Sequence, residues 1–150
     1  MKKGKKKNKG FSLIELLIVV AIILIIAAIA IPNLLRARRS ANEGSATASM
    51  RTVGSGELLY RSTNGNFTTL AGLSADSIID NVLGSGSKSG YVFAATPGTT
   101  TDIQFTATGV PQIGTGATAT GSRYFFTDET QVVRYNVNSA ASSTSSAIGN

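Results

Sequence analysis

The sequence predicts an α+β fold in which one long N-terminal helix, half of it transmembrane, precedes a small antiparallel sheet of about four strands. Three observations predict it. Residues 11–35 form an apolar run, a helical pattern continues to residue 61, and the pattern changes to an alternation of two residues after residue 90. The chain has no cysteine, so packing alone has to hold this fold together.

The apolar run, residues 11–35, is long enough to cross a membrane. It contains a single charged residue, Glu15, and a spanning helix needs about 20 apolar residues. Six of the first ten residues are lysine, and lysines close to a spanning segment stay on the cytoplasmic side. We therefore expect a basic leader, residues 1–10, in the cytoplasm and all residues after 36 on the translocated side.

The helix is predicted to continue past a proline to residue 61. Pro32 removes one backbone hydrogen bond and clashes with the preceding turn, but apolar residues lie on both sides of it, so we expect a kink and not an end. Glu57 and several glycines weaken the later part of the pattern. That part still has one apolar face on which a sheet can pack, formed by Ala46, Met50, Val53 and Tyr60.

The rest of the chain divides into three zones. Residues 62–90 are expected to form a connecting loop with one marginal helix in residues 74–84, capped by Ser74 or Asp76. Residues 91–138 are expected to form the antiparallel sheet, with turns that include Gly109-Val110-Pro111; its four strands are predicted at residues 91–95, 102–107, 122–127 and 131–137. Residues 139–150 lack periodicity and have little apolar content, which is typical of a flexible tail.

Composition excludes several classes of function. The net charge of +6 comes from 14 basic and 8 acidic residues, and removal of the six leader lysines leaves 8 of each, so the charge does not indicate a nucleic-acid partner. The chain also lacks histidine. Because the chain has neither cysteine nor histidine, thiol nucleophiles, histidine-based triads and zinc sites with nitrogen or sulfur ligands are excluded. We expect no enzyme, no metal and no cofactor.

Glu15 needs a reason to lie in an apolar run. A carboxylate at the centre of a bilayer costs about 2.5–3.5 kcal/mol, and less near the end of a helix. The uncut chain offers no good partner, because Lys9 precedes the helix and Arg36 lies about 30 Å further along it. A cut between Gly10 and Phe11 would create an α-amino group one turn from Glu15, and this amine would also be available to a neighbouring copy. The carboxylate would then set assembly and register.

Residues 9–15, KGFSLIE, resemble the cleavage and methylation signature of type IV prepilins, because a lysine-rich leader precedes them and a long apolar helix follows. The resemblance implies that a membrane-embedded prepilin peptidase cuts after Gly10 and N-methylates Phe11. It further implies that Glu15 aligns an incoming subunit and that Pro32 marks the place where the long helix bends. The implied fold is a ladle, in which the outer half of the helix packs on the sheet.

The same resemblance implies a structural protein. The precursor would lie in the bacterial inner membrane with its N-terminus inside, and the mature chain would form a homopolymer, a type IV pilus-like filament on the cell surface. Cytoplasmic assembly ATPases and an inner-membrane platform protein would be its partners. Such filaments serve adhesion, twitching motility, DNA uptake, secretion or electron transfer, and the sequence does not choose among these uses.

Other identities stay open at this point. A major pseudopilin of type II secretion shares the signature, but many of these proteins bind calcium near the C-terminus. Here the late acids are Asp102, Asp128 and Glu129, of which the last two suit a hairpin turn better than a calcium site. One alternative is a secreted domain cut after Ala30, which would leave Glu15 unexplained. The other is an uncut, membrane-tethered monomer. Neither alternative requires residues 9–15 to match the signature.

Overall fold

The computed structural model describes residues 10–99 and 103–149. The chain forms two units, Met1–Leu34 and Leu35–Asn150. Helix α1, Leu13–Asn64, runs through both of them. The predicted leader lies outside the described residues except for Gly10, and so does Asp102 at the start of a predicted strand.

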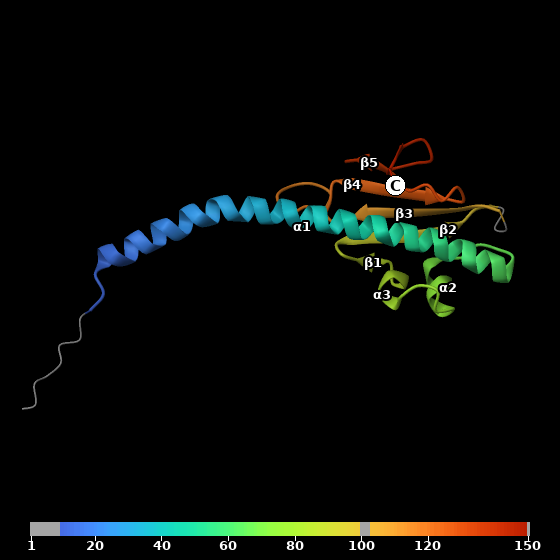
Figure 1. The fold of residues 1–150 in the computed structure, drawn as a ribbon, viewed down its shortest axis with the longest axis horizontal. Coiled ribbons are helices and arrows are strands. Elements are labelled where there is room, and N and C mark those ends of the chain that lie inside the picture. Colours follow the sequence, from blue (N-terminus) through green and yellow to red (C-terminus); the bar gives the residue numbers. More distant parts are fainter. Residues whose placement is uncertain (1–9, 100–102, 150) are drawn as a thin grey trace, which may run out of the picture. The chain divides into compact units, whose positions relative to one another are not determined.

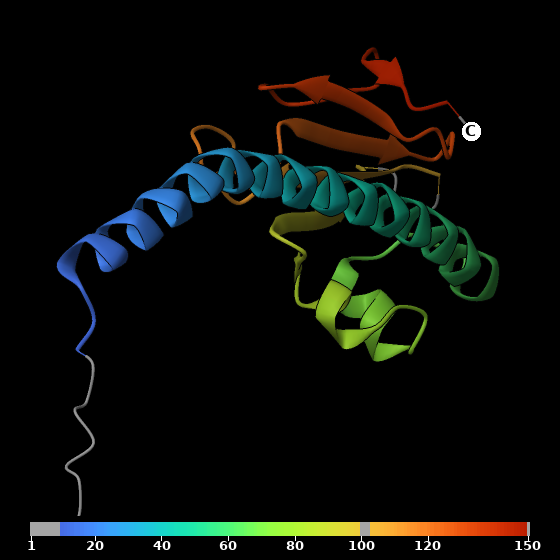
Figure 2. The same ribbon diagram turned by 60° about the vertical axis from the view of Figure 1, so that its left-hand side comes forward.

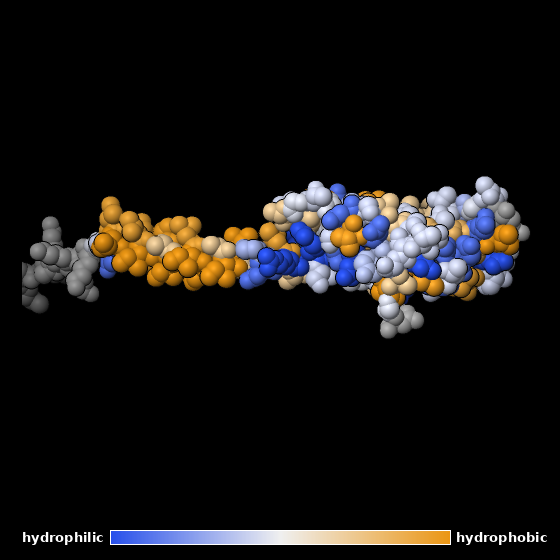
Figure 3. All heavy atoms as spheres, turned by 90° about the horizontal axis from the view of Figure 1, so that it is seen from above, coloured by the Kyte–Doolittle hydropathy of each residue, from blue (hydrophilic) through white to orange (hydrophobic). Residues whose placement is uncertain are grey.

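The long helix is confirmed, because α1 continues for 52 residues with Pro32 inside it. By length and composition, α1 is able to cross a membrane, and no part of its most apolar 18-residue stretch is buried. Leu24 and Ile25, for example, are 64% and 63% exposed. Figure 3 shows this first part of α1 as an almost uninterrupted apolar surface. The later residues mix polar and apolar side chains.

From Leu35 onward, α1 packs on the sheet. Ala46, Met50 and Val53 are buried, and Tyr60 packs partly buried against the same core, so the predicted face is confirmed. Figures 1 and 2 both show this part of α1 lying along one face of the sheet. Half of the core residues outside α1 come from the strands and include Tyr91, Phe93, Phe105 and Phe125, and most of the others come from residues 67–83.

Within the described residues, the sheet has six strands in the order β1-β2-β3-β4-β5-β6, and each strand pairs antiparallel with the next. The prediction of four strands is therefore wrong. The four longer strands correspond to the predicted ones, and the two that were missed have two residues each. The strands are β1 Ser87–Lys88, β2 Tyr91–Pro97, β3 Phe105–Pro111, β4 Arg123–Asp128, β5 Arg134–Val137 and β6 Ser146–Ala147.

Two segments have roles that the sequence did not predict. Gly109-Val110-Pro111, predicted as a turn, forms the end of β3, where Pro111 lies opposite Tyr91. A proline is tolerated there because a residue at the end of a strand can dispense with its N–H donor. The predicted flexible tail, residues 139–150, supplies β6 and Ile148, which packs partly buried against the core.

The connecting segment forms two short helices, α2 Leu70–Ala75 and α3 Asn81–Gly84, where one helix was predicted. Asp80, and not Ser74 or Asp76, caps α3 by accepting the Leu83 N–H at 2.9 Å. That hydrogen bond and the Lys88 ammonium group lower the pKa of Asp80. The cap fits the preference for aspartate at this position.

Hydrogen bonds connect α1 to the loop before β4. Glu43 accepts the backbone N–H and the hydroxyl of Ser122 at 2.8 and 2.9 Å, and its other oxygen lies 3.5 Å from Arg123 Nε. Asn42 donates to the Thr120 carbonyl at 2.9 Å. The fully buried Tyr91 donates its hydroxyl to the Arg123 carbonyl at 2.9 Å. Burial, followed by the Glu43 carboxylate, raises the pKa of Tyr91.

Gly121 allows Tyr91 to occupy this position. A methyl group on Gly121 would meet the Tyr91 hydroxyl oxygen at 1.9 Å and its ring carbon Cζ at 2.6 Å. We therefore expect Gly121→Ala to lower the free energy of unfolding by about 1–3 kcal/mol, the usual cost of overpacking. Urea denaturation of the purified chain in detergent measures this change.

Gly44→Ala is the matched control, because no atom lies within 4 Å of the added methyl group. Alanine in place of glycine inside a helix should raise the free energy of unfolding by about 1 kcal/mol. Equal effects of the two substitutions would contradict the packing described at Gly121.

Candidate processing and assembly site

The predicted cleavage bond, between Gly10 and Phe11, lies just before α1. The helix begins at Leu13, and Gly10, Phe11 and Ser12 have no regular structure. Gly10 is exposed, and Phe11 is 81% exposed. A peptidase has to reach the backbone around the bond that it cuts, and the described residues leave this bond accessible.

Glu15 has a partner within its own chain that the sequence reasoning missed. Its Oε2 accepts the backbone N–H of Ser12 at 2.8 Å, and the Leu16 N–H reaches the Ser12 carbonyl at 3.3 Å. Residues 12–15 read Ser-x-x-Glu, and in a capping box the glutamate side chain returns in this way to the first residue. The Ser-x-x-Glu pattern is the feature of the sequence from which this hydrogen bond could be predicted. The partners expected from the sequence are cations, whereas the observed partner is a neutral backbone N–H.

This capping bond fixes where the carboxylate lies. An acidic group in the first turn also stabilises the helix by about 0.3–1 kcal/mol, because it lies at the positive end of the helix dipole. Because Ser12 follows Phe11 directly, the Glu15 carboxylate lies at the end of α1 where a cut after Gly10 would create an amine. The structure thus brings together Ser12 and Glu15, and Phe11 directly precedes Ser12 in the sequence. Pro32 lies 17 residues further along the same helix, and its predicted kink stays a prediction.

The two late acidic residues that the structure describes, Asp128 and Glu129, lie in a turn. The Asp128 carboxylate accepts the backbone N–H of Thr130 at 3.0 Å and its hydroxyl at 2.5 Å. Glu129 is exposed in the same turn, so the predicted hairpin turn between β4 and β5 is confirmed. Within residues 10–99 and 103–149, no three acidic residues lie close enough together to hold a metal ion.

Glu57 is the second carboxylate with an unusual setting. It is fully buried, and its Oε2 accepts the Thr68 N–H at 3.0 Å. Burial raises the pKa of Glu57 to about 7, against a smaller lowering by the Thr68 hydrogen bond. In the sequence, Glu57 is only an interruption of the apolar face, because no local pattern indicates that the Thr68 N–H of a later loop bonds to it.

Comparison with known proteins agrees with the N-terminal signature. Residues 5–31 match the family described as the prokaryotic N-terminal methylation motif. The chain is 47% identical over 64 residues to the type IV wide pilus major component PilA4 of Thermus thermophilus, which covers 43% of this chain and 49% of that protein. It is 30% identical over 152 residues to the type IV major pilin protein PilA of Myxococcus xanthus, which covers 95% of this chain.

The chain spans only part of the length of these relatives. The matched regions amount to about half of the Thermus protein, at 49%, and to 65% of the Myxococcus protein. The second match extends over nearly the whole of this chain, and therefore includes the sheet as well as the N-terminal helix.

Proposed function

We propose that this chain, a member of the type IV prepilin family, is a structural subunit that polymerises through the first half of α1 into a type IV pilus-like surface filament. The observation that carries the proposal is the combination of the methylation motif with a helix whose apolar half is uncovered within the chain. The role is structural and not catalytic. The names of the two relatives, both pilus components, support it.

The proposed processing begins at the exposed segment before α1. A prepilin peptidase in the membrane cuts after Gly10 and methylates the new amino group of Phe11. The accessibility of both residues supports this step. Removal of the leader also removes six lysines from the end of the helix, and with them the charges that would resist close packing of many copies.

Polymerisation follows from the need to cover the apolar half of α1. In the precursor, the acyl chains of the inner membrane surround it, with the N-terminus in the cytoplasm and residues after 36 outside. Once the subunit leaves the bilayer, the same surface has to lie against other copies, at a gain of about 25 cal/mol for each Å² removed from water. Repetition of one heterologous contact between copies produces an open helical filament.

Glu15 gives the assembly its register in this proposal. Its carboxylate is held at the start of α1 by Ser12, and the amine of a cut chain would arise beside it. An incoming copy brings its Phe11 amine to the Glu15 of a copy already in the filament. An ion pair formed where water is scarce favours the one axial position at which both charges are matched.

The remaining partners are proposed from the family alone. Cytoplasmic ATPases and an inner-membrane platform protein drive the addition of subunits, and Pro32 supplies the bend in α1. A pseudopilin of type II secretion is not favoured, because both relatives are named as pilus components and the described late acids form a turn instead of a calcium site.

The processing step predicts the mass of the mature protein. The intact mass from native cells should correspond to a chain that begins at N-methylated Phe11, and sequencing of the N-terminal peptide should place the methyl group on that residue. A chain that begins at Ile31 would indicate an ordinary signal peptidase instead. A chain that begins at Met1 would indicate a tethered protein, and both results would contradict the filament.

The register role predicts how Glu15 variants behave. Glu15→Ala should still insert into the membrane and be cut, yet the yield of sheared fibres should fall by at least about tenfold, because loss of one partner of a buried ion pair costs about 3–5 kcal/mol. Fibre yield is measured against cell-associated subunit by immunoblotting. A normal yield from Glu15→Ala would contradict the role.

Glu15→Gln separates the two contacts of this side chain. Glutamine can still accept the Ser12 N–H, but it has no charge to offer an amine. If Glu15 acts by ion pairing, Glu15→Gln should assemble as poorly as Glu15→Ala. Restoration of fibres by glutamine would indicate that only the helix cap matters.

A further inference from the structure

Glu57 joins the end of α1 to the loop that follows it. Its side chain is fully buried, its Oε2 accepts the Thr68 N–H at 3.0 Å, and its Oε1 is buried without a hydrogen-bond partner. A buried carboxylate with a free oxygen is costly when ionised, because both oxygens lose water and only one gains a partner. The neutral acid fits this site better.

The charged groups on the loop side of Glu57 do not offset this cost. Arg61 lies four residues on along α1, but its guanidinium group stands over the Phe67 ring, 5.2 Å from the ring centroid. Helix α2 has no charged residue, and Asp76 directly after it is exposed. Thr68 provides one neutral donor. The nearest part of the chain therefore leaves Glu57 without a counterion.

The sheet side is equally poor in cations. Strands β2 and β3 carry no charged side chain. The titratable group of β2, the Tyr91 hydroxyl, donates a hydrogen bond to the Arg123 carbonyl. Asp128, at the end of β4, is held by its own turn, and Glu129 is exposed. The loop after β4 brings the carboxamide of Gln131 close to Gly54, one turn before Glu57, and this group is neutral.

We propose that Glu57 is a proton-dependent latch, which in its neutral form holds residues 65–69 closed on α1 and in its ionised form releases them. The closed state buries Phe67 and the Glu57 carboxyl together. In the open state the carboxylate gains water, and Arg61, at a spacing of four residues, becomes able to pair with it. The inference holds for a single chain and does not depend on filament assembly.

The direction of the pH effect follows from the shift of Glu57. Burial in the closed state raises its pKa to about 7 from an ordinary value of 4.5. The closed state therefore binds the proton more tightly than the open state. Its extra stability is complete below about pH 4.5, declines as the pH rises to about 7, and is absent above that.

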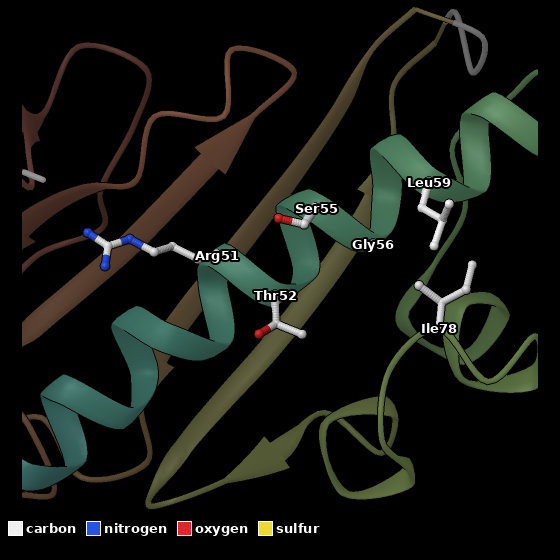
Figure 4. A pocket seen from close by; sticks show the side chains of 6 residues that line it. All are labelled: Arg51, Thr52, Ser55, Gly56, Leu59 and Ile78. Carbon is white, nitrogen blue, oxygen red and sulfur yellow. The ribbon is translucent and has the colours of Figure 1, made fainter.

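The latch controls one wall of a surface groove. Figure 4 shows this groove, with Ser55, Gly56 and Leu59 of α1 on one side and Ile78 on the other. Ile78 belongs to the segment that begins at Thr68, and a methyl group on Gly56 would lie only 3.1 Å from Ile78 Cγ2. Release of Thr68 would free the start of the segment that forms this wall.

Hydrogen exchange at the Thr68 amide tests the latch in the full-length chain in detergent micelles. The protection factor, which removes the intrinsic pH dependence of exchange, should fall about tenfold per pH unit between pH 5 and 7 and then level off. The Phe93 amide, bonded to the Gly86 carbonyl at 2.7 Å, is the reference and should change little.

Two variants complete the test. Glu57→Gln keeps an acceptor for the Thr68 N–H but cannot ionise, so its protection factor should not vary with pH. Glu43→Gln changes another glutamate of α1 that accepts a loop N–H, and it should keep the dependence of the unmodified chain at Thr68. A slope that persists in Glu57→Gln would overturn the proposal.

The unmodified chain decides the question even if Glu57→Gln does not fold. A flat protection factor at Thr68, or an equal slope at Phe93 and Thr68, would rule out a local latch. Carbon-13 NMR of the Glu57 carboxyl group gives an independent result. A titration midpoint near 7 supports the latch, and a midpoint near 4.5 overturns it.

Discussion

The uncovered apolar surface on the first half of α1 is the constraint on which the rest of this structure depends. No part of its most apolar stretch is buried within the chain, and apolar surface is unfavourable when it is left in water. The same helix then provides Ala46, Met50 and Val53 to the core of the second unit. A single continuous element therefore provides both the uncovered apolar surface and part of the buried core.

Much of this arrangement could be predicted from the sequence because the signals are local. The apolar run with one carboxylate specifies a helix that can span a membrane, and the spacing of Met50 and Val53 specifies the face that meets the sheet. Ser12 and Glu15 also form a local pattern, a capping box, which indicates a neutral N–H partner for Glu15 in place of a cation. The motif that defines the candidate site lies within seven consecutive residues.

The features that could not be predicted depend on contacts distant in the sequence. Strand β6 contains only Ser146 and Ala147 and pairs through its backbone, which leaves no alternation to detect. Glu57 interrupts an apolar face of the helix, and the Thr68 N–H that bonds to it comes from a loop 11 residues further along the chain. Gly54 and Gly56 count against a helix by propensity, yet they are positions where Gln131 and Ile78 come close. Tertiary packing overrides local preference at each of these positions.

The two short outer strands have a consequence for the filament proposed above. The edge of a sheet presents unpaired N–H and C=O groups to which a second sheet can add, and this is a common route to aggregation. Here the sheet ends on one side in β1 and on the other in β6, each of two residues. Each outermost strand thus offers only two residues in line for pairing. In the proposed filament, crowded copies would associate through their helices while their sheets stay separate.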